Sequence, residues 1–256
     1  MKKTLLSLTI TLLTGSSIAQ NLIVNGDFED YSACPTMFGG LYLANGWMNP
    51  NTASPDYFHT CGSGGFAVPL SDLGYQQPHS GFGYAGLVIK NSTPFLEQRD
   101  YMQTQLMSPL SIGTTYELSM WMSLADFYSQ FSSSSFGALF STVPVTTGDD
   151  ETLPQTPQVL NDPNNYLASI TSWTFVSFTF TADSSYSYVT IGNFYDDANT
   201  LTQPIPTGNW PKAYYFFDDI TLSVATGISE ASDVQVNIYP VPFADHLNVE
   251  VNNSTD

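Results

Sequence analysis

A run of alternating residues near the middle of the chain combines one aromatic ring with hydrogen-bonding groups. From Tyr116 to Leu124, apolar side chains alternate with Glu117, Ser119, Trp121 and Ser123, which is the period of a β-strand with one face in a core. If the apolar set faces the core, the other face presents Trp121 among hydroxyl and carboxyl groups. Such a face offers stacking together with polar contacts, as sugar binding requires.

Other aromatic residues could extend this face. Phe175 with Trp173 is one candidate pair, and an alternate pair from Tyr214–Phe217 is another. The predicted ligand-binding residues are therefore Trp121, Glu117, Ser119 and Phe175. The alternative is that Trp121 lies beneath the segment 143–172 as part of a secondary core.

Catalytic motifs are missing from the sequence. It contains no GxSxG elbow, no HExxH pair and no Walker loop. The histidines that could act as imidazole bases are His59, His79 and His246. Glycoside hydrolysis needs two opposed carboxylates, but among 23 acidic residues some pair will be close by chance. We therefore predict a binding protein and not an enzyme, with a polysaccharide hydrolase that carries its site on loops as an alternative.

The elements that must position these residues are β-strands. Period-two or strand-forming patterns also cover 174–180, 188–191 and 214–222, and turn-forming clusters such as Asn45-Gly46 and Ser80-Gly81 separate them. Short strands with regular turn signals predict an all-β sandwich. The segment 143–172 is rich in Pro, Asp, Asn and Thr, which predicts a long surface loop.

The charge is strongly acidic. Asp and Glu number 23 against five Lys and Arg, for a net charge of −18. After position 19 the basic residues are Lys90, Arg99 and Lys212. Nucleic-acid binding and docking on an anionic membrane both need clustered positive charge, so we expect neither.

The first 19 residues have the pattern of a secretory signal peptide. Lys2 and Lys3 precede a nine-residue apolar stretch, and Ser17-Ile18-Ala19 predicts cleavage before Gln20. The alternative is a buried N-terminal helix or strand. The stretch is too short to span a bilayer, and no longer apolar run follows, so we expect no membrane span in the mature chain. The predicted location is secreted or at the outer cell surface, where Cys34 and Cys61 could form a disulfide; two buried free thiols are the alternative.

The composition changes near the C-terminus. Residues 225–233 are small, polar and acidic, which predicts a linker. Two strand-like segments follow, Val236–Tyr239 and Leu247–Val251, and two strands do not form a stable domain alone.

Several motifs, taken in order, resemble a known group of domains. They are Asn25–Glu29, Asn45–Trp47, His79–Gly81, Tyr116–Met122, Trp173–Val176 and Phe217–Leu222. This order resembles the carbohydrate-binding modules of families four, nine and twenty-two, which are galactose-binding-like jelly rolls. Pro55–Phe58 and Thr190–Phe194 look like a branch found in surface proteins of Bacteroidetes. The resemblance implies a jelly-roll β-sandwich over residues 20–224 that binds glycan, or a structural or adhesive surface protein with the same fold.

The resemblance also implies a structural calcium ion that ties the first strand to the last. Carried over by position, Glu29 and Asp218 are the expected carboxylate ligands, with Asp27 or Asp219 as a less certain partner. Calcium prefers such oxygen ligands, although acids in turns are also commonly solvated or cap the turn.

Residues Val236 to Glu250 are similar to the start of the type IX secretion sorting domain. That motif usually has Asn between two prolines where this chain has Val241, and it continues through further strands. The expectation is an incomplete sorting domain over 234–256 that engages the type IX secretion machinery.

Overall fold

The computed structural model describes residues 20–206, 208–225, 234–239 and 248–253. Contacts within the chain divide it into two units, Met1–Val224 and Ala225–Asp256. The expected signal peptide (1–19) and residues 226–233 of the expected linker lie outside the described residues. Within the described ranges, no helix is long and apolar enough to cross a membrane.

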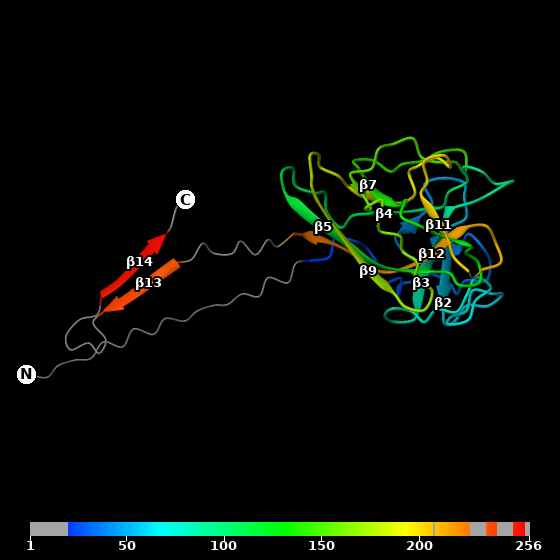
Figure 1. The fold of residues 1–256 in the computed structure, drawn as a ribbon, viewed down its shortest axis with the longest axis horizontal. Coiled ribbons are helices and arrows are strands. Elements are labelled where there is room, and N and C mark those ends of the chain that lie inside the picture. The colour runs from blue at the N-terminus through cyan, green and yellow to red at the C-terminus, as the bar shows by residue number, and fades with distance from the viewer. Residues whose placement is uncertain (1–19, 207, 226–233, 240–247, 254–256) are drawn as a thin grey trace, which may run out of the picture. The chain divides into compact units, whose positions relative to one another are not determined.

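The first unit is built from strands, with one short 3₁₀ helix and no α-helix among its described residues (Figure 1). The elements in chain order are η1 (Gly40–Leu43), β1 (Trp47–Met48), β2 (Asp56–His59), β3 (Gly83–Lys90), β4 (Tyr101–Gln105), β5 (Thr115–Leu124), β6 (Phe131–Ser133), β7 (Gly137–Ser141), β8 (Val159–Leu160), β9 (Thr174–Thr181), β10 (Tyr188–Gly192), β11 (Thr202–Pro204) and β12 (Ala213–Val224).

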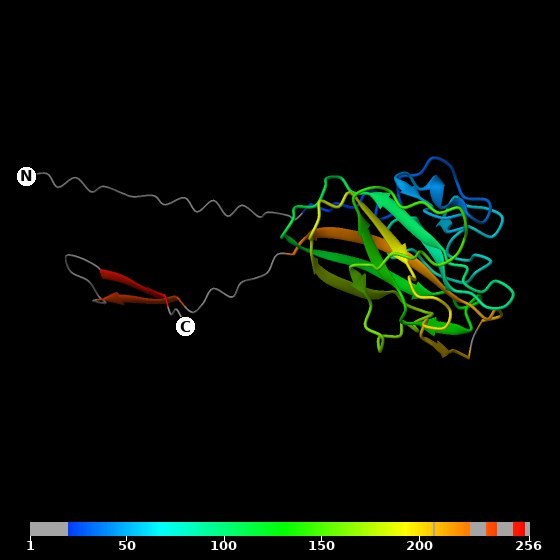
Figure 2. The same cartoon turned by 90° about the horizontal axis from the view of Figure 1, so that it is seen from above.

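Two five-stranded antiparallel sheets form a jelly-roll sandwich, and the predicted fold class is confirmed (Figures 1 and 2). One sheet has the order β1-β4-β10-β7-β8 and is called the β4 sheet below. The other has the order β2-β3-β12-β5-β9 and is called the β12 sheet. Strands β11 and β6 form a separate two-stranded sheet. Neighbours such as β12 and β5 are distant in sequence, so the long strands are held mainly by non-local contacts.

The main core lies between the two sheets. On β5 the apolar set of the predicted alternation is buried there, because Cβ atoms alternate across a strand. Tyr215 and Phe217 of β12 face it from the neighbouring strand. The inward residues of β5 are Tyr116, Leu118, Met120, Met122 and Leu124.

A second, smaller core covers part of the outer face of the β12 sheet. Tyr214 and Phe216 belong to it, and they alternate along β12 with Tyr215 and Phe217 of the main core. Residues from the 60–82 segment, including Phe66 and Leu73, close over them. The Cys34–Cys61 disulfide lies at the start of this segment, as predicted.

The two ends of the sandwich lie side by side. The Leu22 amide donates to the Leu222 carbonyl (2.7 Å), and the Ile220 amide donates to the Gly26 carbonyl (2.8 Å). A Cβ on Gly26 would lie 2.0 Å from the Ile220 carbonyl oxygen, so the turn needs glycine at this position. Opposite it, β12 has an irregularity between Asp218 and Thr221, where Asp219 has a φ of 47°.

The second unit contains one antiparallel pair, β13 (Val234–Tyr239) and β14 (Asn248–Asn253). Val234 pairs with Asn253, and Tyr239 pairs with Asn248. The remaining residues of the expected sorting segment lie outside the described ranges.

Candidate functional site

The predicted ligand-binding residues lie on neighbouring strands of the β12 sheet. Trp121 of β5 is the register partner of Phe175 of β9, and their ring centroids are 5.2 Å apart. Both side chains project from the outer face, because the inward positions on β5 belong to the core. Phe175 is 50% exposed and Trp121 is half-buried. The two rings therefore form an open aromatic surface across adjacent strands.

One face of the Trp121 ring is covered by an imidazole. The His79 ring stacks on Trp121 with a centroid distance of 4.0 Å and an interplanar angle of 18°. Trp173 meets His79 edge-on (6.2 Å), and its indole N–H donates to the Gln77 carbonyl (2.8 Å). His79, Trp121, Trp173 and Phe175 are called the aromatic strip below. The sequence motif at 79–81 did not reveal this stacking role for His79.

Polar groups continue the same outer face beyond the aromatic strip. The Ser119 hydroxyl is within 2.7 Å of the Thr221 hydroxyl on β12. Ser119 is nearly buried, and Glu117, further along β5, is half-buried. On β9 the paired residues Ser177 and Thr179 are exposed. All four predicted ligand-binding residues are thus brought together on one face, next to a surface of hydroxyl groups.

The histidine of the strip is held by the irregularity in the middle of β12. Its backbone N–H donates to Asp218 Oδ2 (2.8 Å), and its ring Nδ1 contacts a carboxylate oxygen of Asp219. The Ser80 hydroxyl donates to the other Asp219 oxygen (2.7 Å). These acids, which the sequence suggested as metal ligands, position the 79–83 loop against the aromatic strip.

The other two predicted metal ligands, Glu29 and Asp27, lie on the segment 25–29, and Glu29 contacts the same loop. Glu29 Oε1 accepts from the N–H groups of Phe82 (2.6 Å) and Gly83 (3.0 Å). Asp27 and Asp219 both line a shallow hollow beside the junction of the two chain ends. Burial, and then the neighbouring charge of Asp219, raise the pKa of Asp218 to about 8.

In this arrangement, the described part of the chain has no group of three or more His, Cys, Asp and Glu side chains placed to hold a metal ion. Backbone N–H groups already donate to Glu29 and to both oxygens of Asp218. A calcium ion at this loop would have to compete with those donors, and carbonyl oxygens and water would have to complete its coordination.

The segment 143–172 covers the β4 sheet. The Gln103 side chain and the Val145 backbone exchange two hydrogen bonds (2.8 and 3.2 Å), and the Leu153 N–H donates to the Tyr101 hydroxyl (3.0 Å). Gln158 likewise exchanges two hydrogen bonds with the Phe140 backbone. Within it β8 adds a short edge strand, where the sequence predicted only loop. The outer face of the β4 sheet is therefore covered at Tyr101 and Gln103, whereas Gln105 at the end of β4 stays exposed.

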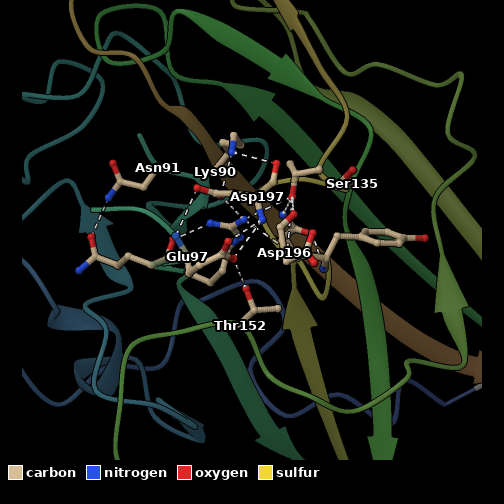
Figure 3. A network of polar contacts seen from close by, with 12 residues as sticks. Lys90, Asn91, Glu97, Ser135, Thr152, Asp196 and Asp197 are labelled. Atoms are coloured by element: carbon tan, nitrogen blue, oxygen red, sulfur yellow. Dashed lines mark hydrogen bonds and ion pairs between the residues drawn. The ribbon is translucent and has the colours of Figure 1, made fainter. Parts of the chain in front are cut away.

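A buried polar network fixes this cover (Figure 3). Arg99 is fully buried and donates to Asp197 (2.6 Å), which also pairs with Lys90 (2.8 Å). The Gln98 side chain donates to Asp150 of the covering segment (2.7 Å). Burial acts to raise the pKa of Asp197, but the hydrogen bonds and charges of Lys90 and Arg99 outweigh it and hold that pKa below its usual range.

No protein-family model and no curated protein matches this chain. Among solved structures, the chain is similar to the CBM22-1 xylan-binding domain from Paenibacillus barcinonensis, with 12% identity over 75% of this chain and 97% of that one, and a TM-score of 0.37. It is also similar to the K3 cleaved adhesin domain of Lys-gingipain from Porphyromonas gingivalis (14%, 78% and 96%, TM-score 0.37).

A third similar structure is the N-terminal cellulose-binding domain from Cellulomonas fimi β-1,4-glucanase C (12%, 72% and 91%, TM-score 0.33). At these identities and scores, the assignment of a function has to rest on the residues of this chain itself.

Proposed function

We propose that this chain is a non-catalytic glycan-binding module of the cell exterior, and that the aromatic strip with Glu117 and Ser119 is its binding face. The observation that carries the proposal is the open Trp121–Phe175 pair beside exposed hydroxyl groups. Aromatic rings pack against the apolar faces of sugar rings, and hydroxyl and carboxyl groups bond sugar hydroxyls. An open strip across two strands suits several units of a chain better than a single enclosed sugar.

The charge of the protein narrows the class of glycan. A net charge of −18 repels polyanions such as sulfated or uronic-acid-rich chains. In the aromatic strip and its polar extension, Glu117 adds a further carboxylate to the face. We therefore propose a neutral polysaccharide as the ligand.

Export is part of the proposal. The N-terminal pattern at 1–19, the Cys34–Cys61 disulfide and the resemblance of residues 234–256 to a sorting domain all support a secreted or outer-surface location. In this proposal the type IX secretion machinery is the partner that recognises the C-terminal segment.

A structural calcium ion near the 79–83 loop is proposed as well. The family resemblance supports it, and so does the placement of Glu29 and Asp218, which both accept hydrogen bonds from the 79–83 loop. Its role would be to stabilise the loop on which His79 stacks against Trp121.

The binding proposal is tested with the full chain on a glycan array, followed by calorimetry with the polysaccharide that binds. Trp121→Ala and Phe175→Ala should each weaken binding at least about tenfold, because a central aromatic contact is worth about 2 kcal/mol. Tyr42→Ala removes an aromatic ring elsewhere that is more exposed than Phe175 (61% against 50%), and it should leave affinity unchanged.

Two results would replace the proposal. If no neutral glycan binds, the structural or adhesive alternative takes its place. If the chain releases reducing sugar from the bound polysaccharide, the hydrolase alternative does.

A further inference from the structure

A cavity of about 280 Å³ opens on the outer side of the β12 sheet, away from the aromatic strip. Asp56 of β2 and Asp100, which precedes β4, contribute carboxylates to its lining. Lys212, at the start of β12, and the rings of Phe38 and Tyr128 line it too. The second core, which includes Tyr84 and Phe216, separates this cavity from Trp121. Nothing in the proposed function uses these residues.

Both carboxylates are almost fully buried but retain acceptor capacity. Asp56 is 2% exposed and accepts one bond at each oxygen, from the Gly39 N–H (2.8 Å) and the Tyr214 hydroxyl (2.6 Å). Asp100 is 3% exposed and also accepts one bond at each oxygen, from the N–H groups of Ser54 (3.1 Å) and Val88 (2.8 Å). A carboxylate can accept about four hydrogen bonds, so each has lone pairs left for a ligand.

The lysine has unused donors. Among described residues, Lys90 and Arg99 form ion pairs with Asp197, whereas Lys212 has no carboxylate within 4.0 Å. Its ammonium lies 5.1 Å from the centre of the Tyr128 ring, and it makes one long hydrogen bond to the Tyr128 hydroxyl (3.4 Å). An ammonium has three donors. At least two of them remain for a group that enters the cavity.

The cavity is close to electrically neutral. Burial raises the pKa of Asp56 to about 8 and that of Asp100 to about 6. Near pH 7 Asp56 is therefore mostly protonated, and the charge of Asp100 balances that of Lys212. Because these two opposite charges balance, the lining gives neither a cationic nor an anionic ligand a net electrostatic attraction. The lining instead favours a neutral molecule that both donates and accepts hydrogen bonds.

Aromatic rings stand at the mouth of the cavity. Phe38 is 52% exposed, and Tyr128 is half-buried. The Trp210 ring lies 6.0 Å from Tyr128, and Phe95 lies on another side of the Lys212 ammonium (5.8 Å). Exposed rings next to buried polar groups bind ligands that have one apolar face and several hydroxyls.

We propose that this cavity is a second sugar-binding pocket, which takes one neutral sugar ring with its hydroxyls on Asp56, Asp100 and Lys212 and its apolar face on Phe38. The volume lies just below the range of about 300–1,000 Å³ of pockets for drug-sized ligands, and this suits a single ring. The pocket is separate from the aromatic strip, so the two bind independently. The strip holds a chain of sugars, and the pocket holds a terminal unit or a side branch.

The test is a titration of the isotope-labelled full chain, followed by amide NMR. The probes are the methyl glycosides of β-glucose, β-galactose, β-xylose and α-mannose, each raised to about 50 mM to reach millimolar affinities. For at least one probe we expect saturable shifts at the amides of Gly39, Val88 and Tyr128. No saturable shift at these amides with any of the four sugars would overturn the pocket.

Variants separate this pocket from the aromatic strip. Lys212→Met should weaken the saturable shifts at least tenfold, whereas Trp121→Ala should leave them unchanged. Phe38→Ala, at an exposed position, gives a second readout if Lys212→Met does not fold, and it too should weaken them. Equal affinity in wild type and in a folded Lys212→Met or Phe38→Ala variant would overturn the proposal, whatever the glycan array shows for Trp121.

Discussion

The outer faces of the two sheets are covered to different extents. The β4 sheet is covered by the 143–158 segment, which is held by side chain–backbone hydrogen bonds at Gln103, Tyr101 and Gln158. The β12 sheet is closed over only part of its width, by an apolar second core. Its β5–β9 part stays open, with Trp121 and Phe175 at the surface. Binding is therefore assigned to the face that the chain leaves uncovered.

The two covers are also stabilised by different kinds of interaction. The cover of the β12 sheet is stabilised by burial of rings such as Phe58 and Phe66, which is non-directional. The cover of the β4 sheet depends on hydrogen bonds, and the Arg99–Asp197 pair lies next to it, where the Arg99 N–H donates to the Asp150 carbonyl. Removal of one partner of such a polar contact leaves the other without compensation. The polar cover should be the more sensitive of the two to single substitutions.

The largest effect is expected for Arg99→Met. It takes the donor away from the Gln98 and Tyr195 carbonyls, and it leaves the partly exposed Asp197 with Lys90 and the Glu97 N–H as partners. The loss of one member of a largely buried pair costs about 3–5 kcal/mol. The melting temperature should fall by about 10 °C, at about 2–4 °C for each kcal/mol in a domain of this size. Differential scanning calorimetry measures this change in melting temperature.

Lys90→Met is the matched control for Arg99→Met, because Lys90 pairs with the same Asp197 oxygen but is partly exposed. It should cost at most about 1 kcal/mol. Equal losses in the two variants would show that the buried Arg99 contributes no more to stability than the partly exposed Lys90.

The next effect is a pH dependence that comes from the β12 side of the molecule. The folded chain holds protons on Asp100, Asp56 and Asp218 that the unfolded chain releases above about pH 4, so stability is lost as the pH rises through about 6 and then about 8. The lowered pKa of His59 acts in the opposite direction. Its side chain is less buried, so the three carboxyl groups should dominate.

Melting scans at about pH 5 and about pH 9 should therefore differ by at least about 5 °C, with the acidic sample the more stable. Asp56→Asn removes one of the two largest contributions, the other being that of Asp218, and should make the profile less steep. A melting temperature that rises with pH in the wild type would contradict the burial of these carboxyl groups.

The sequence was informative where a pattern repeated. Alternation over 116–124 predicted which side chains of β5 face the core, and the motifs at 25–29 and 217–222 implied that the chain ends meet. The covered face of the β4 sheet was not foreseen, because the 143–158 segment binds through single Gln and Tyr side chains that follow no period.

The second pocket was missed for a related reason. Asp56 and Asp100 are far apart in sequence and follow no motif, and the approach of β2 to the segment before β4 brings them together. Lys212 stood out only as one of three basic residues after position 19. Such a pocket is a product of tertiary structure, and local sequence cannot indicate it.

The smallest effect concerns calcium at the loop that borders the open face. We expect an excess of calcium over a chelator to raise the melting temperature by about 2–4 °C, equivalent to about 1 kcal/mol. The effect is small because the ion must compete with the N–H groups that already bond Glu29 and Asp218. Asp218→Ala should abolish the rise, whereas Asp162→Ala, at an exposed acid outside the 79–83 loop, should preserve it. Identical melting with and without calcium would remove the ion from the proposal and leave these carboxylates as caps of the 79–83 loop, a role that positions His79 on Trp121 without any metal.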